Sequence, residues 1–225
     1  MTTIGFIGSG RIGGALAQLA AAAGHDIVLS NSRGPQSLRE TAARLGTRAR
    51  TATTTEAAAA GDLVVVTIPV RAYRQVPVAA LHGRVVIDTL NYDPARQGAV
   101  PEIEAGDTPP HLLLQSHLRD AYVVKAFSNV FFRHLPQLAR TAGAPDRSAV
   151  PIAGDSATAK AAVATLIDSL GFDAYDVGPL AESRRFAPGT PAQLAYLDPD
   201  GMVAAPGRPA SAADLAALLE KAERS

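Results

Sequence analysis

A glycine-rich turn near the start of the sequence is the feature that most constrains its fold. Residues Ile4–Gly13 read I-G-F-I-G-S-G-R-I-G, which places Gly8, Gly10 and Gly13 in the pattern G-x-G-x-x-G between an apolar run and a helical pattern. In an α/β fold the first glycine allows a tight turn, the second lets a phosphate group approach the backbone, and the third lets the helix pack against the strand. Glycine turns also occur for structural reasons alone, but a strand before and a helix after this pattern favour dinucleotide binding.

Short apolar runs alternate with helical patterns along most of the chain, and several runs, such as Val64–Val66, are unbroken β-branched residues typical of strands in a parallel sheet. This alternation predicts an α/β fold of Rossmann type, a doubly wound, mostly parallel sheet of about eight strands with a small C-terminal extension. The predicted strands are Thr3–Ile7, Asp26–Ser30, Arg48–Ala52, Leu63–Thr67, Arg84–Asp88, Tyr122–Ala126, Ala149–Ala153 and Asp173–Val177. The predicted helices are Arg11–Ala23, Pro35–Leu45, Arg71–Leu81, Pro110–Leu118 and Ser156–Leu170.

The pattern also predicts how the chain is organised into domains. We expect a Rossmann domain over residues 1–177, with its cofactor half in about residues 1–125, and a small extension over residues 178–225. The segment Asn91–Pro110 is rich in proline, glycine and acidic residues, and it predicts a long surface loop on the ligand side.

The extension ends in a predicted amphipathic helix over residues 211–224. Ser211 and Asp214 predict a variant of the capping box at its start. The helix either packs on the body of the protein or contacts a second subunit, and its apolar face consists of Leu215, Leu218 and Leu219.

Composition excludes several classes of function. The chain contains no cysteine, so disulfides, thiolate metal sites and a cysteine nucleophile are excluded. Its formal net charge of 0 gives no electrostatic signature of nucleic-acid or membrane-surface binding. No stretch approaches the roughly 18 apolar residues of a membrane span. We therefore expect a cytoplasmic protein that acts on a small molecule, without nucleic acid or membrane as a partner.

The end of the second predicted strand indicates which dinucleotide is bound. An NAD-binding fold usually has an acidic residue there, about twenty residues after the glycines, to accept hydrogen bonds from the ribose 2′-hydroxyl. Here the segment Ser30–Arg33 offers hydroxyl and amide donors and a positive charge, which suit a 2′-phosphate. A solvated turn is the alternative, because Asn, Ser, Gly and Pro all favour turns. We expect the cofactor to be NADP(H).

Three other strand ends carry candidate ligand-binding residues, because ligands of doubly wound folds lie beyond the carboxyl ends of the strands. Together they could form a wall around a nicotinamide, with apolar contacts and a few amide or hydroxyl groups. No tyrosine is followed four residues later by a lysine, and no histidines show metal-ligand spacing, so we expect no metal and identify no certain catalytic residue. The candidate segments are Thr67-Ile68-Pro69-Val70, Thr89-Leu90-Asn91-Tyr92 and Ala126-Phe127-Ser128-Asn129.

Several motifs taken together resemble the NADPH-dependent coenzyme F420 reductase family, from about Thr3 to Pro191. They are the glycine turn, S-N-S-R, V-V-V-T-I-P, V-V-I-D-T-L-N, V-V-K-A-F-S-N, I-A-G-D and V-G-P-L-A-E-S-R. The family is also similar to the cytosolic reductase domain of six-transmembrane metalloreductases. The resemblance implies an NADP-binding sheet, an extension that closes a deazaflavin pocket, and hydride exchange between NADP(H) and the 8-hydroxy-5-deazaflavin coenzyme F420. It also implies a homodimer.

The resemblance further implies roles for individual residues. The pyrophosphate would lie along Gly8, Ser9, Gly10, Arg11, Ile12 and Gly13. The 2′-phosphate would be held by Ser32 and Arg33, beside Asn31 and Ser37. The nicotinamide would be flanked by Thr67, Ile68, Pro69, Val70 and Asn91 on one side, and positioned by Ala126, Ser128 and Asn129 on the other.

This sequence also departs from the family pattern. Ser37 stands where a basic phosphate contact is expected, Ser128 stands where the family has asparagine, and Phe131–His134 adds bulk beside the pocket. Ala187 stands where an acidic residue is expected. These departures concern the second substrate more than the NADP site.

Hydride transfer between two flat rings mainly requires that their reacting carbons be held close together, so the absence of an acid–base motif does not exclude an enzyme. The alternatives are an NADPH-dependent reductase of flavin, ferric complexes, an imine or a carbonyl, and a non-catalytic NADPH-sensing protein that signals through the C-terminal helix.

Overall fold

The computed structural model describes residues 1–198 and 205–223, and it divides into two compact units, Met1–Val123 and Val124–Ser225. The predicted division into a Rossmann domain over residues 1–177 and an extension over residues 178–225 remains a prediction. The strands are β1 (Thr3–Ile7), β2 (Asp26–Ser30), β3 (Ala49–Thr51), β4 (Leu63–Val66), β5 (Val85–Asp88), β6 (Tyr122–Lys125), β7 (Ala149–Gly154) and β8 (Asp173–Gly178).

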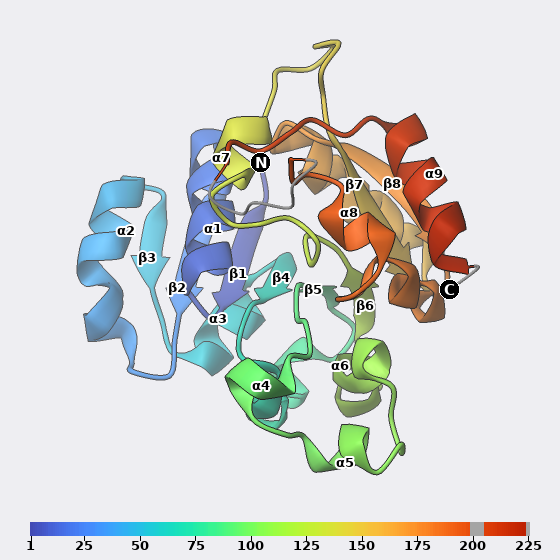
Figure 1. Cartoon of the computed structure of the whole chain (residues 1–225). Helices are drawn as coiled ribbons and strands as arrows, with labels where there is room; N and C mark the ends of the chain where they lie inside the picture. Colours follow the sequence, from blue (N-terminus) through green and yellow to red (C-terminus); the bar gives the residue numbers. More distant parts are fainter. Residues whose placement is uncertain (199–204, 224–225) are drawn as a thin grey trace. The chain divides into compact units, whose positions relative to one another are not determined.

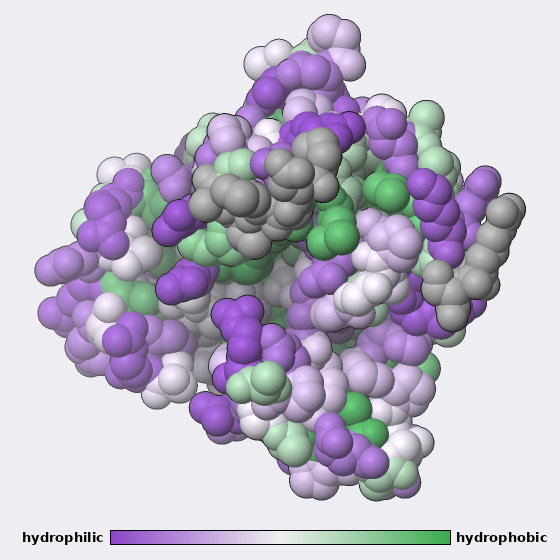
Figure 2. Space-filling view, viewed as in Figure 1, coloured by the Kyte–Doolittle hydropathy of each residue, from purple (hydrophilic) through white to green (hydrophobic). Residues whose placement is uncertain are grey.

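The first unit contains a parallel sheet in the order β3-β2-β1-β4-β5 (Figure 1). All residues of β4 are buried, as expected for the central strand of a sheet covered on both faces. Its helices are α1 (Arg11–Ala22), α2 (Arg39–Leu45), α3 (Thr54–Ala60) and α6 (Leu113–His117). Shorter turns of helix are η1 (Pro35–Leu38), η2 (Val70–Gln75), η3 (Ala79–Leu81), α4 (Pro94–Gln97), α5 (Pro101–Glu104) and η4 (Pro110–Leu112). The surface around α2 is largely hydrophilic, on the left of Figure 2.

In the second unit, β7 pairs with β6 in the antiparallel direction and with β8 in the parallel direction. Its helices and shorter helical turns are α7 (Leu135–Leu138), α8 (Ala157–Ser169), η5 (Leu180–Phe186), η6 (Pro191–Leu194) and α9 (Ala212–Glu223). The predicted α/β fold with eight mostly parallel strands and a C-terminal helical extension is confirmed. No helix within residues 1–198 and 205–223 has both the length and the apolar character that crossing a bilayer requires.

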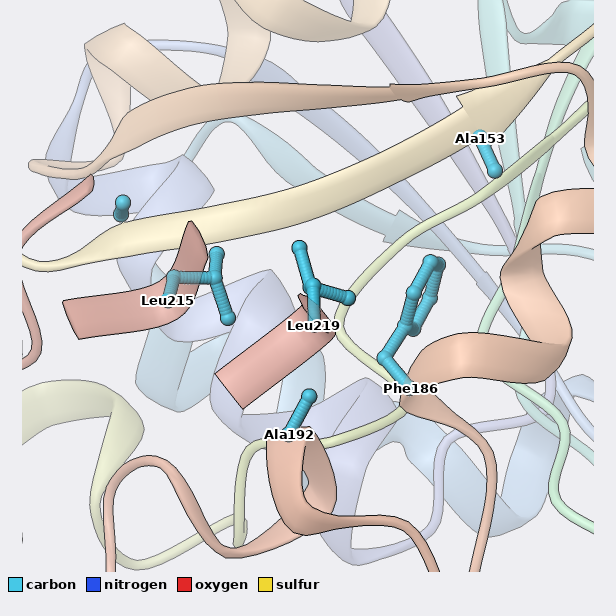
Figure 3. Packing of buried hydrophobic residues seen from close by; sticks show 6 residues of the cluster. Ala153, Phe186, Ala192, Leu215 and Leu219 are labelled. Atoms are coloured by element: carbon cyan, nitrogen blue, oxygen red, sulfur yellow. The ribbon is translucent and has the colours of Figure 1, made fainter. Parts of the chain in front are cut away.

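The C-terminal helix packs on the second unit itself. Leu215 and Leu219 are buried and point toward Phe186 and Ala192, as Figure 3 shows. The predicted capping box is present, because the backbone N–H of Ser211 donates to Asp214 at 2.9 Å and the Asp214 N–H donates to the Ser211 hydroxyl at 3.2 Å. The last predicted helix residue, Arg224, lies outside the described residues. Of the two alternatives for this helix, the structure shows packing on the body of the protein.

The prediction of one helix over residues 71–81 is wrong. Pro77 separates η2 from η3, and Val76 before it adopts an extended conformation with φ −69° and ψ 126°. A proline disfavours helical conformation in the preceding residue and removes a backbone donor, which explains the break. The predicted helices over 35–45 and 110–118 each begin with a 3₁₀ turn, η1 and η4 respectively.

Two further elements differ from the sequence analysis. The predicted loop Asn91–Pro110 contains the short helices α4 and α5. Helix α3 was not predicted, although Thr53 and Glu56 form a capping box in which the Thr53 N–H donates to Glu56 at 2.8 Å. A threonine followed three residues later by glutamate is a sequence signal that could have revealed this helix.

The glycine turn brings β1, α1 and β4 into close contact. Gly8 has a φ of 98°, which favours glycine, and a Cβ atom there would lie 2.3 Å from the Thr67 carbonyl oxygen. A Cβ atom at Gly13 would lie 2.6 Å from the Gly8 carbonyl oxygen and 2.7 Å from the Thr67 methyl carbon. The close contacts between β1, α1 and the end of β4 therefore require glycine at positions 8 and 13.

Replacing Gly13 by alanine should destabilise the protein by about 1–3 kcal/mol, because the added methyl group has no room against backbone atoms. Gly14→Ala is the matched control, since a Cβ atom at this neighbouring helical position would meet nothing within 4 Å. It should stabilise by up to about 1 kcal/mol through higher helix propensity. Urea unfolding of both variants measures the difference, and equal stability would contradict the close contact at Gly13.

Candidate functional site

A cavity of about 500 Å³ opens in the first unit beyond the carboxyl ends of β1, β2 and β4. Its volume lies in the range of small-molecule sites, and its position matches the crevice where doubly wound folds bind ligands. Its walls are formed by Ile7, Gly8, Ser9, Gly10, Asn31, Ser32, Arg33, Thr54, Thr67, Ile68, Pro69, Arg71, Ala72 and Gln75. The structure thus brings three of the predicted segments together in one cavity.

The floor of the cavity is the turn between β1 and α1. Gly10 is the N-cap of α1, and because glycine has no side chain, no side-chain cap hydrogen bond is made to the first N–H groups of the helix. Nothing lies within 4 Å of a Cβ atom built on Gly10, so a ligand can approach the backbone there. Unpaired N–H groups and the positive end of the helix dipole make such a helix start suited to a phosphate. Arg11 and Ile12 belong to α1, and neither they nor the packed Gly13 line the cavity.

The wall after β2 is a turn held by its own side chains. The Asn31 carboxamide accepts from the Arg33 N–H at 2.9 Å and donates to the Ser37 hydroxyl at 2.9 Å. The Ser37 hydroxyl donates in turn to the Gly34 carbonyl at 2.7 Å. Ser37 thereby orders the turn but does not line the cavity. The exposed side chains of Ser32 and Arg33 are left facing the cavity.

Ser30 is not among the residues that could contact a phosphate, contrary to the sequence analysis. It is fully buried, and its hydroxyl donates to the Phe6 carbonyl on the neighbouring strand at 2.7 Å. The Ser30 hydroxyl is thus used within the sheet. The first residue of this segment that lines the cavity is Asn31.

The wall after β4 begins with Thr67, Ile68 and Pro69 and continues into η2. Val70, which was predicted to flank the ligand, is buried and turned away from the cavity. Arg71, Ala72 and Gln75 line it instead, a placement that a regular helix over residues 71–81 does not predict. Thr54, at the start of α3, was missed with its helix.

The segment with α4 and α5 contacts η2 through two side chains. The Gln97 carboxamide accepts from the Val70 N–H at 2.7 Å and donates to the Asn91 carbonyl at 3.0 Å. Asn91 itself does not line the cavity. Arg74 pairs with Glu102, and this hydrogen bond lowers the pKa of the Glu102 carboxyl group below its usual value. These contacts fix η2, and with it one wall of the cavity.

The cavity is positively charged. None of its lining residues is acidic, and two of them, Arg33 and Arg71, are exposed arginines. Within the part of the chain that the structure describes, neither guanidinium forms an ion pair with a carboxylate. An anionic group would therefore find uncompensated positive charge there.

The remaining predicted residues, Ala126, Ser128 and Asn129, are buried in the second unit just after β6. Phe127 between them has a φ of 57°, an uncommon conformation for a residue other than glycine, and its ring packs edge-on against Phe172 at 6.1 Å. The Asn129 side chain donates to the Ala192 carbonyl at 3.0 Å. Its own carbonyl oxygen is buried and has no hydrogen-bond partner within the described residues.

Two other polar groups of the second unit serve its structure. Burial raises the pKa of Tyr196, whose hydroxyl donates to the Ala149 carbonyl. His134 is buried, and one of its ring nitrogens lies 2.9 Å from the Ala205 carbonyl. The bulky segment noted at Phe131–His134 is packed together, with the Phe131 and Phe132 rings 4.6 Å apart. Among the described residues, no three histidine or acidic side chains cluster as a metal site would require.

Comparisons with known proteins agree with this geometry. Residues 3–92 match the family of coenzyme F420-dependent NADP oxidoreductases. A hypothetical protein from Sinorhizobium meliloti is 30% identical, with a TM-score of 0.67, over 81% of this chain and 88% of that one. A protein from Arthrobacter sp. FB24, to which F420-dependent NADP reductase activity is ascribed, is 23% identical with a TM-score of 0.67, over 82% and 88%.

Similarity extends to longer reductases at the level of the fold. The 1-pyrroline-5-carboxylate reductase of Streptococcus pyogenes is 18% identical, with a TM-score of 0.57, and the match covers 82% of this chain and 61% of that one. No curated protein sequence matches the chain.

Removing the Gln97 side chain should loosen the wall formed by η2. In Gln97→Ala the Val70 N–H loses its acceptor, so its amide hydrogen should exchange on the order of five times faster, the worth of one ordinary hydrogen bond. Gln18→Ala is the control, because Gln18 is an exposed glutamine on α1 outside the cavity. Unchanged protection of Val70 in Gln97→Ala would show that this contact does not hold η2.

Proposed function

Since the chain belongs to the family of coenzyme F420-dependent NADP oxidoreductases, we propose that it transfers a hydride between NADP(H) and the deazaflavin coenzyme F420. The observation that carries this proposal is the cavity of the first unit, in which a phosphate-binding glycine turn and a cationic turn lie in the same walls. The family supplies the class of reaction, NADP-dependent oxidoreduction. The deazaflavin as second substrate is the finer part of the proposal.

The residues of the cavity fit NADP(H). The turn Gly8–Gly10 and the start of α1 would hold the pyrophosphate through backbone N–H groups. Ser32 and Arg33 would bind the 2′-phosphate through a hydroxyl and a charge-assisted hydrogen bond. An acidic residue that would accept from a 2′-hydroxyl is missing from the cavity walls, which favours NADP(H) over NAD(H).

The protein's part in such a reaction is to position the two rings. When bound, the nicotinamide donates or accepts the hydride and the deazaflavin is its counterpart. Ile68 and Pro69 would provide an apolar surface beside the nicotinamide. Good positioning of this kind can contribute about 7–11 kcal/mol to lowering a barrier.

Two of the alternative functions can be compared with the structure. An imine or carbonyl reductase is favoured by fold similarity to 1-pyrroline-5-carboxylate reductase, of whose length this chain covers 61%. A sensor signalling through the C-terminal helix is disfavoured, because Leu215 and Leu219 are buried in the second unit. Flavin or ferric complexes are further acceptors to test. The homodimer implied by the family resemblance remains a prediction.

The purified protein should oxidise NADPH when coenzyme F420 is added, which is followed as loss of the visible absorption band of the oxidised deazaflavin. NADH should support this reaction poorly because it lacks the 2′-phosphate. Free flavin, a ferric chelate and a cyclic imine are tested in parallel. Reduction of one of these in place of F420 would retain the NADP site and contradict the deazaflavin assignment.

Arg33→Ala should weaken NADPH binding by about 1.5–3 kcal/mol, the worth of a charge-assisted contact. NADH binding should change little, because NADH has no 2′-phosphate. Arg44→Ala removes an equivalent exposed charge from α2 without touching the cavity, and serves as the control. Calorimetric titration measures all three proteins. An equal loss for both nucleotides in Arg33→Ala would refute the 2′-phosphate role.

A further inference from the structure

We propose that Arg71 is a second cation of the 2′-phosphate subsite, which it enters from the wall opposite Arg33. Arg33 follows β2 and Arg71 follows β4, and these strands flank β1 on its two sides. Both side chains line the same cavity. The inference rests on the NADP(H) binding proposed above and is independent of the hydride acceptor.

The surroundings of Arg71 differ from those of the next arginine on the same element. Arg74 pairs with Glu102 and donates to the Tyr73 hydroxyl at 3.0 Å, so its charge is already compensated. Arg71 is exposed at the cavity, and no carboxylate pairs with it in the described ranges 1–198 and 205–223. Of the two arginines of this turn, Arg74 is therefore paired with a carboxylate, whereas Arg71, which lines the cavity, is not.

The position of Arg71 is fixed by the packing of η2. Val70, the preceding residue, is buried and its N–H is bound by Gln97. Tyr73, two residues later, is also buried and packs edge-on against His117 at 5.5 Å. Because Val70 and Tyr73 pack against the protein, the Arg71 side chain extends from the opposite face of η2, where it lines the cavity.

The wall after β2 supplies less positive charge than a bound 2′-phosphate requires. A phosphate monoester carries a charge of about −1.5 to −2 near neutral pH, more than one guanidinium neutralises. Ser37 has no positive charge, and its hydroxyl is bound to Asn31 and Gly34. Arg33 is thus the cation that the β2 wall contributes to the cavity, and Arg71 supplies another. Guanidinium groups suit this task because their N–H groups match the geometry of phosphate oxygens.

One binding experiment distinguishes the proposed role of Arg71 from two other roles. An arginine stacked on the adenine ring would bind the nucleoside whether or not a 2′-phosphate is present. A solvated surface arginine would contribute to neither. The discriminating probes are adenosine 2′,5′-bisphosphate and adenosine 5′-monophosphate, which differ by the 2′-phosphate alone.

The full chain is titrated with each probe by calorimetry as wild type, Arg71→Ala, Arg71→Lys and the control Arg44→Ala, after circular dichroism confirms folding. Arg71→Ala should bind the bisphosphate on the order of tenfold more weakly or worse, and the monophosphate within about twofold of wild type. Arg71→Lys should recover part of the loss, because it keeps the charge but lacks the planar fork. The loss should shrink at high salt.

An equal loss for both probes would overturn the proposal in favour of adenine stacking, and no loss for either would overturn it in favour of a solvated side chain. If the wild-type protein does not prefer the bisphosphate, the NADP(H) site itself is wrong, and the inference fails with it. Failure of F420 to accept a hydride leaves these results unaffected, so the two proposals can fail separately.

Discussion

The contact of Gly13 with the Gly8 carbonyl and Thr67 is the constraint on which the rest of the site depends. It lets α1 begin directly at the end of β1, with the neighbouring end of β4 against both. Without a side chain at these positions, the start of α1 can lie at the floor of the cavity, where its N–H groups have no capping side chain. The exposed start of α1, to which we assign the pyrophosphate, thus follows from backbone packing.

The two walls of the cavity are ordered by contacts that do not involve a ligand. On one side, Asn31 and Ser37 hold the turn that carries Arg33. On the other side, Gln97 and the pair of Arg74 with Glu102 hold η2. A site whose groups are already placed loses less entropy when a nucleotide binds. The lining contains no acidic residue, which is compatible with the additional phosphate of the proposed NADP(H).

Much of this fold could be predicted because its signals are local. Each predicted strand is present with ends that differ by no more than one residue, since β-branched runs and glycine turns mark strands directly. The two differences also have local causes, since Thr53 and Glu56 cap the start of α3 and Pro77 interrupts the helix predicted at 71–81. Arg71 could not be assigned from sequence, because its place in the cavity depends on how η2 is held by a segment about thirty residues away. The burial of Ser30 depends likewise on its partner in β1.

A crystal structure of the complex with NADP⁺ would locate both phosphate groups of the nucleotide on the protein. We expect the pyrophosphate over the Gly8–Gly10 turn and the 2′-phosphate within charge-assisted hydrogen-bonding distance of the Arg33 guanidinium, about 2.7–2.9 Å. A nucleotide bound elsewhere on the protein, or a 2′-phosphate directed away from Arg33 into solvent, would contradict this expectation.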